Sequence, residues 1–327
     1  MFNNKVILIT GGTGSFGQEC VKHLLEKYSL KKIIIFSRDE LKQYQMQNKF
    51  NKKNLRFFIG DVRDLSRLRI AFRNVDYVIH AAALKHVPIA EYNPTECIKT
   101  NIEGSNNVVS AAIDCKVKKV IALSTDKAVN PINLYGATKL CAEKIFVSSN
   151  ALSGEGTRFS VVRYGNVLNS RGSIIPLINK YKNEKKNSFP FTDKRMTRFF
   201  ISLEDSVKFV IQCLKQMDKG EVFIPKMSSV FVEDLIKTIA PNISIKVSGL
   251  RPGEKIDELL ISKDESVQVI EEKNQYIIFP NNTFVNSKFS KKKKLNKIFE
   301  FFEYSSKNNK NFLSLNKLKN FLKKNKF

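Results

Sequence analysis

A tyrosine and a lysine four residues apart, Tyr135 and Lys139, lie in a segment that reads STDKAVNPINLYGATK. On a helix the two side chains would lie one turn apart on one face. An ammonium at that distance stabilises a phenolate, and a tyrosine with an ordinary pKa of about 10 needs such help to act as a base at neutral pH. A hydroxyl, an acid and an amine come before them: Thr125, Asp126 and Lys127. The segment therefore predicts proton-transfer chemistry.

The elements around this segment predict that its side chains gather at the edge of a sheet. Residues 120–123 form a short apolar run that predicts a strand ending near Thr125, and residues 134–148 repeat apolar residues at helical spacing. Open α/β sheets bind ligands beyond the carboxyl ends of their strands. With 9 Tyr and 56 Lys+Arg in the chain, a Tyr-x-x-x-Lys pair alone is weak evidence. The pair becomes informative because it lies between a predicted strand and a predicted helix.

A glycine-rich turn near the amino terminus predicts a dinucleotide site. Residues 5–10 form a mainly apolar run, followed by GGTGSFG and an amphipathic segment at 18–27. The glycines fit both G-x-G-x-x-G and G-x-x-G-x-x-G, patterns of a backbone that turns tightly and approaches a pyrophosphate. The candidate residues in this turn are Gly11, Thr13, Gly14, Ser15, Phe16 and Gly17.

The end of the next predicted strand, residues 32–36, decides which dinucleotide the site prefers. An NAD site usually has a carboxylate there for the ribose 2′-hydroxyl. This chain has Ser37, Arg38 and Asp39. Arg38 suits a bidentate contact with a 2′-phosphate, and Ser37 adds a hydrogen bond, so we expect NADP. Asp39 keeps NAD open, as does the alternative that Arg38 is a solvated loop residue.

Two further strand ends complete the predicted cofactor edge. Residues 55–59 precede Asp61 and Val62, which are placed for an adenine, and residues 77–80 precede the small Ala81 and Ala82. Alternating strands and helices through residue 165 predict an α/β fold with a Rossmann-type doubly wound parallel sheet. We expect residues 1–165 to form the NADP-binding domain with the catalytic residues. Residues 166–327 would form a smaller α/β substrate-binding lobe, interleaved with the first domain.

Long strings of this sequence resemble the extended short-chain dehydrogenases/reductases and, within them, the nucleotide-sugar 4,6-dehydratases. They are TGGTGSFG, FSRDELKQ, GDVRD, AAALKHVP, STDKAVNPINLYGATK, VVRYGNVLNSRGS, TDKRMTRFFIS and RPGEK. The resemblance covers nearly the whole chain. It is closest to the soluble, inverting UDP-N-acetylglucosamine 4,6-dehydratases, which catalyse the first step of pseudaminic acid biosynthesis for surface glycans.

This resemblance implies a lyase with an internal redox cycle. Tightly bound NADP⁺ would take a hydride from sugar C4 and return it to C6 after water has left. Tyr135 would remove the C4 hydroxyl proton, Thr125 would hydrogen-bond that oxygen, and Lys139 would hold the nicotinamide ribose. Lys127 would be the C5 base and Asp126 the acid for the departing C6 hydroxyl. A homo-oligomer is also implied.

The pair Asp126 and Lys127 separates this group from its relatives. Retaining dehydratases of the deoxythymidine-diphosphate type have Thr-Asp-Glu here, and bifunctional dehydratase/5-epimerases generally have methionine in place of Tyr135. A lysine at the base position favours inversion, provided that burial or a neighbouring cation lowers its pKa. The alternative is that Lys127 pairs with Asp126 or with a substrate phosphate. A C4 epimerase remains the main enzymatic alternative.

Polar residues of the second half are candidates for binding the UDP-sugar. Arg251 suits the diphosphate and Glu254 a ribose hydroxyl, in a turn of composition Arg-Pro-Gly-Glu. The alternatives are that Glu254 braces the turn and that the other charges are solvated. The further candidates, with Tyr135, are Lys85, Asn166, Arg171 and Ser173.

Composition bounds the remaining possibilities. The five cysteines, odd in number and without C-x-x-C, predict a reduced compartment and no metal site. There is no run of about 18 apolar residues, so we expect a cytoplasmic protein without membrane contact. The net charge of +25 permits an NADP-sensing regulator that binds nucleic acid, but the lysines are spread along the chain, which favours an enzyme with no nucleic-acid partner. Apolar residues at helical intervals after Ser306 predict a docked or interface helix.

Overall fold

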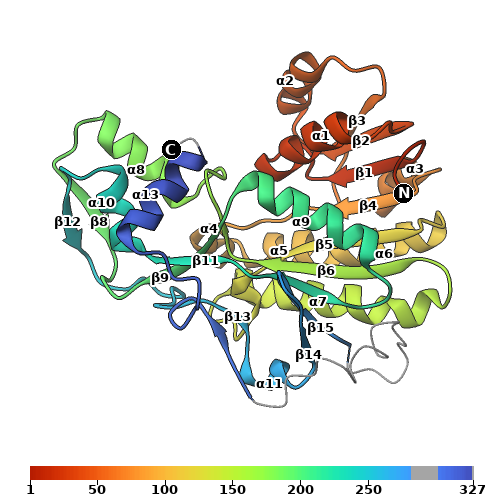
Figure 1. Cartoon of the computed structure of the whole chain (residues 1–327). Coiled ribbons are helices and arrows are strands. Elements are labelled where there is room, and N and C mark those ends of the chain that lie inside the picture. The colour runs from red at the N-terminus through yellow and green to blue at the C-terminus, as the bar shows by residue number, and fades with distance from the viewer. Residues whose placement is uncertain (281–300, 326–327) are drawn as a thin grey trace.

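The computed structural model of the chain describes residues 1–280 and 301–325 (Figure 1). Its centre is a nine-stranded sheet, and Figure 1 shows α1 (Ser15–Lys27) and α9 (Leu203–Gln216) on one face with α6 (Gly104–Asp114) and α7 (Leu134–Ser153) on the other. In sheet order the strands are β14 (Val269–Glu271), β15 (Gln275–Ile278), β10 (Val222–Pro225), β6 (Arg158–Tyr164), β5 (Lys119–Thr125), β4 (Tyr77–His80), β1 (Val6–Thr10), β2 (Lys32–Ser37) and β3 (Leu55–Ile59). Strands β10 through β3 run parallel, and β15 and β14 are antiparallel additions at one edge. The predicted doubly wound α/β fold is confirmed.

The helices follow from the apolar patterning, and the central strands are buried because helices cover both faces of the sheet. The remaining helices are α2 (Glu40–Phe50), α3 (Leu65–Phe72), α4 (Val87–Tyr92), α5 (Pro94–Ile98), the π-helix η1 (Lys99–Glu103), the short 3₁₀ turn η2 (Asp126–Ala128), α8 (Ile174–Asn183), α10 (Val232–Ile239), α11 (Lys263–Ser266) and α13 (Leu315–Lys324).

The strand order places a crevice between β1 and β4. The chain leaves β1 toward β2 and β3 and then crosses over to β4, so the connections diverge at this point. Gly11 follows β1 with a φ of +65°, and a Cβ built on it would lie 2.8 Å from the backbone nitrogen of Ala82, just after β4. Only glycine combines that dihedral angle with so close an approach. The predicted glycine turn therefore sits at the switch point of the sheet.

The second half of the chain builds smaller sheets beside the carboxyl edge. A three-stranded sheet contains β11 (Ser228–Phe231), β9 (Thr197–Ile201) and β7 (Asn166–Val167), and two pairs are β12 (Ser244–Val247) with β8 (Ser188–Phe191) and β13 (Leu259–Ile261) with β16 (Tyr304–Ser305). The three-stranded sheet and the β12–β8 pair contribute to a second apolar core that includes Phe189, Phe200 and Leu235, whereas the β13–β16 pair packs into the first core. The same half also supplies β10, β14 and β15 to the central sheet. A division at residue 165 stays a prediction.

The carboxyl-terminal segment contains the predicted docked helix. Leu318 and Leu322 of α13 are buried in the second core, against α10, which confirms that the helix is docked. Among the described residues, no helix is both long enough and apolar enough to cross a membrane.

Candidate active site

The catalytic segment begins where β5 ends. Thr125 is the last residue of the strand, and its hydroxyl accepts a hydrogen bond from the backbone N–H of Lys127 (3.4 Å), which caps the η2 turn. The same hydroxyl donates to Oδ1 of Asp126 (2.9 Å). These local bonds fix the threonine, the aspartate and the start of the lysine side chain relative to one another.

Helix α7 brings Tyr135 against this turn. Asn133 caps the helix by accepting a hydrogen bond from the N–H of Gly136 (2.8 Å). A Cβ on Gly136 would lie 2.1 Å from the carbonyl oxygen of Lys127, so the absence of a side chain lets α7 begin directly on the catalytic turn. The predicted strand-to-helix passage is confirmed, and Tyr135 and Thr125 both line one cavity.

Burial dominates the proton affinities of Tyr135 and Lys139. Burial raises the pKa of Tyr135 to about 12, although the charge of Lys127 and a hydrogen bond with Thr125 act in the opposite direction. Burial lowers the pKa of Lys139 to about 8, and its ammonium donates to the carbonyl oxygen of Leu123 (2.6 Å). The sequence pointed to Lys139 as the cation that helps the phenol, whereas in the structure Lys127 opposes the effect of burial.

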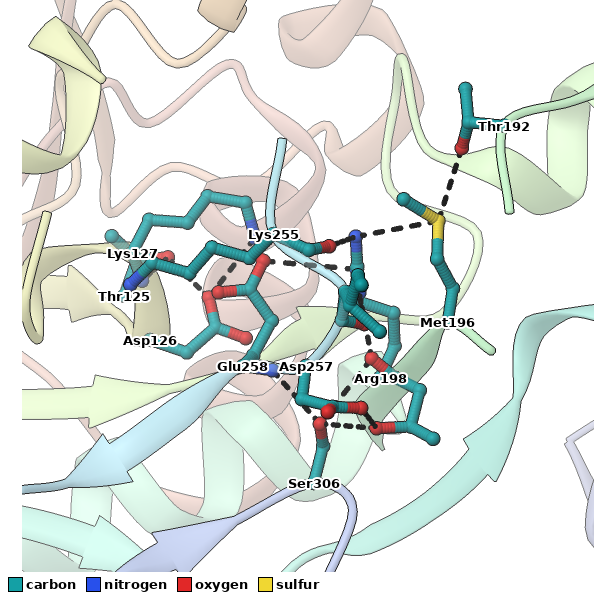
Figure 2. A network of polar contacts seen from close by, with 12 residues as sticks. Thr125, Asp126, Lys127, Thr192, Met196, Arg198, Lys255, Asp257, Glu258 and Ser306 are labelled. Atoms are coloured by element: carbon teal, nitrogen blue, oxygen red, sulfur yellow. Dashed lines mark hydrogen bonds and ion pairs between the residues drawn. The ribbon is translucent and has the colours of Figure 1, made fainter. Parts of the chain in front are cut away.

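Lys127 forms ion pairs with two carboxylates (Figure 2). Its Nζ lies 3.1 Å from Oδ1 of Asp126 and 3.1 Å from Oε1 of Glu258. Burial alone lowers the pKa of Lys127, but the charges of Asp126 and Glu258 outweigh it and raise that pKa above its ordinary value. The expectation of a lowered pKa for Lys127 is therefore wrong, and the alternative, an ion pair with Asp126, is found. The pKa of Lys127 is raised because Glu258 adds a second negative charge beside its ammonium.

Glu258 is a residue of the catalytic cluster that sequence reasoning missed. It directly precedes β13, and its side chain is buried. The only signal was a charged residue immediately before the apolar Leu259–Ile261, a pattern that solvated strand ends share.

Asp126 contacts Thr125 and Lys127 but does not itself line the cavity that those two residues line. Its side chain is fully buried, and Oδ2 has no hydrogen-bond partner among the described residues. A Cβ on Gly165 would lie 3.1 Å from this oxygen. Burial raises the pKa of Asp126 and the charge of Glu258 raises it further, while Lys127 lowers it. The net direction is upward, which favours the protonated acid.

A cavity of about 660 Å³ runs along the carboxyl edge of the sheet, a size typical of small-molecule sites. Thr125, Lys127 and Tyr135 line it. All the residues proposed to bind the dinucleotide line it as well: Gly11, Thr13, Gly14, Ser15, Phe16, Gly17, Ser37, Arg38, Asp61, Val62, Ala81, Ala82 and Lys139.

Of the further substrate candidates, some line the cavity and others do not. Those that line it are Lys85, Asn166, Arg171 and Ser173. Arg251 is exposed and Glu254 half-buried, and neither lines the cavity. Their turn is tied to the start of α7, because the Asn133 side-chain amide donates to the carbonyl oxygen of Gly253 (2.8 Å). The contacts of Arg251 and Glu254 with substrate stay predictions.

The glycine turn fits a dinucleotide. Helix α1 begins after Gly14, which makes no side-chain cap, so the first N–H groups of the helix can bind a pyrophosphate. A Cβ on Gly17 would lie 2.3 Å from the carbonyl oxygen of Gly12, so the helix packs closely on the turn.

The end of β2 separates the three residues that the sequence left ambiguous. Asp39 caps α2 by accepting a hydrogen bond from the N–H of Lys42 (2.9 Å), and the two side chains form an ion pair. Ser37 is buried and accepts a hydrogen bond from Gln43 (3.0 Å). The side chain of Arg38 is 55% exposed and lines the cavity, as does Lys42, which sequence reasoning missed.

A loop of the second half lies against the glycine turn. The ammonium of Lys85 donates to the carbonyl oxygen of Arg171 (2.8 Å), and the backbone N–H of Arg171 donates to the hydroxyl of Ser15 (3.2 Å). Burial lowers the pKa of Lys85. The two halves of the chain therefore meet across the cavity.

Comparison with known proteins shows to which family the chain belongs. The family described as "Polysaccharide biosynthesis protein" matches residues 7–280. The chain belongs to this family. A relative from Campylobacter jejuni named "UDP-N-acetylglucosamine 4,6-dehydratase (inverting)" is 56% identical over 94% of each chain. A Rickettsia felis relative named "UDP-glucose 4-epimerase" is 45% identical over 81% of this chain and 80% of its own.

Among solved structures of this fold, Pen from Bacillus thuringiensis is similar over 99% of this chain and 98% of its own. Its TM-score is 0.90 and its sequence identity 38%. The likeness extends through both halves of the chain, so the smaller sheets of the second half are part of the shared architecture.

Proposed function

We propose that the protein is a C5-inverting UDP-N-acetylglucosamine 4,6-dehydratase, a lyase that removes water from the sugar. The product would be UDP-2-acetamido-2,6-dideoxy-beta-L-arabino-hex-4-ulose. The observation that carries this proposal is that Thr125, Lys127 and Tyr135 line the same cavity as the glycine turn, with Asp126 bonded to Thr125 and Lys127. The relatives from Campylobacter jejuni, which share this activity by name, support it.

The first role belongs to Tyr135, which removes the proton of the C4 hydroxyl while Thr125 hydrogen-bonds that oxygen. NADP, when bound, supplies the reversible hydride transfer that this oxidation and the later reduction at C6 require. Burial raises the pKa of Tyr135, so the phenol needs added positive charge to ionise. Lys127, already acting in that direction, is one source of it.

The second role belongs to the pair Lys127 and Asp126. A ketone at C4 acidifies the C5 proton, which Lys127 accepts, and Asp126 gives its proton to the departing C6 hydroxyl. Each such transfer is worth about 10² to 10⁴ in rate. Before this step Lys127 must lose a proton, and the carboxylate of Glu258, 3.1 Å from its Nζ, is an acceptor within reach, because Asp126 keeps its own proton for the departing hydroxyl.

Two cations at the end of β2 support NADP over NAD. Arg38, Asp39 and Lys42 all line the cavity, but the carboxylate of Asp39, which would favour NAD, caps α2 and pairs with Lys42. We expect Arg38→Ala to weaken NADP binding roughly tenfold and to change NAD binding much less, since only NADP has the phosphate that the guanidinium would bind. Calorimetric titration with both dinucleotides measures this. Equal losses would remove the proposed role.

The same proposal includes the setting of the enzyme. It would catalyse the first step of pseudaminic acid biosynthesis, in the cytoplasm, as a homo-oligomer. The similarity to the Campylobacter jejuni relative, over 94% of each chain, supports the reaction, and the setting follows from the resemblance in sequence.

The second candidate function is a C4 epimerase, which is favoured by the Rickettsia relatives named UDP-glucose 4-epimerase. One experiment distinguishes it from the dehydratase. The protein is incubated with UDP-N-acetylglucosamine in deuterated water, and the sugar is followed by NMR and mass spectrometry. Loss of water, deuterium at C5 and an inverted C5 coupling pattern are expected. A C4 epimer of unchanged mass would favour the epimerase, and an unchanged sugar would exclude this substrate.

A further inference from the structure

Glu258 belongs to the second half of the chain, and its side chain contacts Lys127 of the catalytic segment (Figure 2). Its side chain is only 2% exposed. Oε1 lies 3.1 Å from Nζ of Lys127 and 3.7 Å from Nε of Arg198 on β9. A carboxylate buried to this extent requires such partners to stay charged.

The backbone around Glu258 is held in place. Its N–H donates to the hydroxyl of Ser306 (2.9 Å). The guanidinium of Arg198 donates to the carbonyl oxygens of Ile256 (2.8 Å) and Lys255 (2.8 Å), so the cation is bound to the segment that carries Glu258. Lys255 reaches back to the catalytic segment and donates to the carbonyl oxygen of Val129 (2.6 Å). The carboxylate is therefore fixed at the ammonium of Lys127.

Two carboxylates thus share one ammonium, but their surroundings differ. Around Glu258, burial raises the pKa, and the charges of Lys127, Arg198 and Lys255 together reverse that effect and lower it. Around Asp126 the principal cation is Lys127, and burial and Glu258 raise its pKa.

The groups that face this cluster come from several elements. Asp126 and Lys127 lie on η2, Arg198 on β9, and Lys255 and Glu258 on the segment before β13, while Tyr135 on α7 also feels the charge of Lys127. Arg198 and Lys255 act on Glu258, whereas ionised Asp126 would be a buried negative charge whose one ion-pair partner among the described residues, Lys127, is already paired with Glu258. A proton on Asp126 removes it.

We propose that Glu258 is a positioning residue for the elimination step, which serves as the counter-ion of Lys127 and thereby leaves Asp126 to carry the proton for the departing hydroxyl. In that step Lys127, after passing its ammonium proton to Glu258, takes the proton of the breaking C5–H bond. The C5=C6 double bond forms as the C6–oxygen bond breaks, and the departing hydroxyl leaves as water with the proton of Asp126. The link to elimination rests on the proposed function. The sharing of protons among the three residues does not.

The test measures protonation directly. Infrared spectra of the protein as a function of pH follow the carbonyl stretch of a protonated carboxylic acid. We expect such a band at pH 7 in the wild type and its loss in Asp126→Asn. In Glu258→Gln, where Asp126 becomes the only carboxylate paired with Lys127, the band should disappear roughly one pH unit lower or more. Glu258→Asp, which keeps the charge, should retain it more nearly as in the wild type.

The matched control is Asp257→Asn, which removes a carboxylate from the same segment. Asp257 accepts a hydrogen bond from Thr197 (2.7 Å) and makes no ion pair with Lys127 among the described residues. Its titration should match the wild type. A purely structural role of Glu258 would lower stability in Glu258→Gln and leave the band in place, which would overturn the proposal. So would a wild-type spectrum at pH 7 that Asp126→Asn does not change, a result that needs no folded Glu258 variant.

Measurement of enzyme turnover gives a second test of the proposal. Glu258→Gln should lower the rate of water loss about tenfold or more at pH 7 and spare C4 oxidation, because a larger fraction of the general acid is then ionised. Near wild-type water loss would overturn the positioning role. If the wild type does not dehydrate UDP-N-acetylglucosamine, the proposed function fails, and the infrared titration still decides whether Glu258 controls the proton on Asp126.

Discussion

Tyr135 and Lys127 serve different steps in the proposed reaction, so their variants should fail differently. Tyr135→Phe removes one oxygen and should lower C4 oxidation by about 10² to 10⁴. Lys127→Ala should spare reversible C4 oxidation and stop the loss of water, because the C5 proton then has no acceptor. Single-turnover absorbance of the reduced nicotinamide, together with mass spectrometry of the sugar, separates the two steps. If Lys127→Ala dehydrates substrate at a near wild-type rate, the base is another group.

The lowered pKa of Lys139 makes the free energy of unfolding depend on pH. Its pKa falls from about 10.5 to about 8 because it is buried, so between these pH values the unfolded chain binds the proton and the folded protein does not. The cost of burying the ammonium is therefore fully present below pH 8 and is relieved as pH rises toward 10.5. The difference in unfolding free energy between wild type and Lys139→Met should shift in favour of the wild type over this window, as urea denaturation would detect. A difference that does not vary with pH would show that Lys139 is not buried as a cation.

At the scale of elements, the start of α7 depends on one missing side chain. A Cβ on Gly136 would lie 2.1 Å from the carbonyl oxygen of Lys127, so Gly136→Ala must push α7 away from η2. Overpacking of this kind costs about 1 to 3 kcal/mol, and we expect turnover to fall as well because Tyr135 moves with the helix. Urea denaturation and kinetics measure both. Gly156→Ala, whose Cβ would meet only the carbonyl oxygen of Ser153 at 3.0 Å, is the control. Equal effects of the two variants would contradict the packing argument.

The elements that carry local patterns could be predicted from the sequence. The strands at Leu55–Ile59 and Tyr77–His80 and the helix that carries Tyr135 were predicted because hydrophobic periodicity and turn residues are local signals. The pairing of β15 with β10 and the contact of Glu258 with Lys127 join residues far apart in the chain. No local pattern encodes such pairs, so the raised pKa of Lys127 could not be predicted either.

At the scale of the whole molecule, a buried arginine joins the two halves of the chain. Arg163 on β6 pairs with Glu143 on α7 (2.6 Å) and with Glu265 on α11 (2.8 Å), and its side chain is 2% exposed. It also donates to the carbonyl oxygen of Leu260 (2.9 Å), two residues after Glu258. The central sheet thereby holds the strand that positions Glu258 beside Lys127.

Removing this arginine should therefore affect both stability and chemistry. Arg163→Met leaves two carboxylates without their cation, and breaking a buried pair costs about 3 to 5 kcal/mol. Arg158→Met, on the same strand, removes a half-exposed pair with Asp218 (3.0 Å) and should cost about 1 kcal/mol or less. Urea denaturation compares the two. Since β13 follows Glu258, the water-loss step should decline in Arg163→Met more than C4 oxidation does, at temperatures where the variant is folded. Equal declines in both steps would mean that the anchor supports the fold without positioning Glu258.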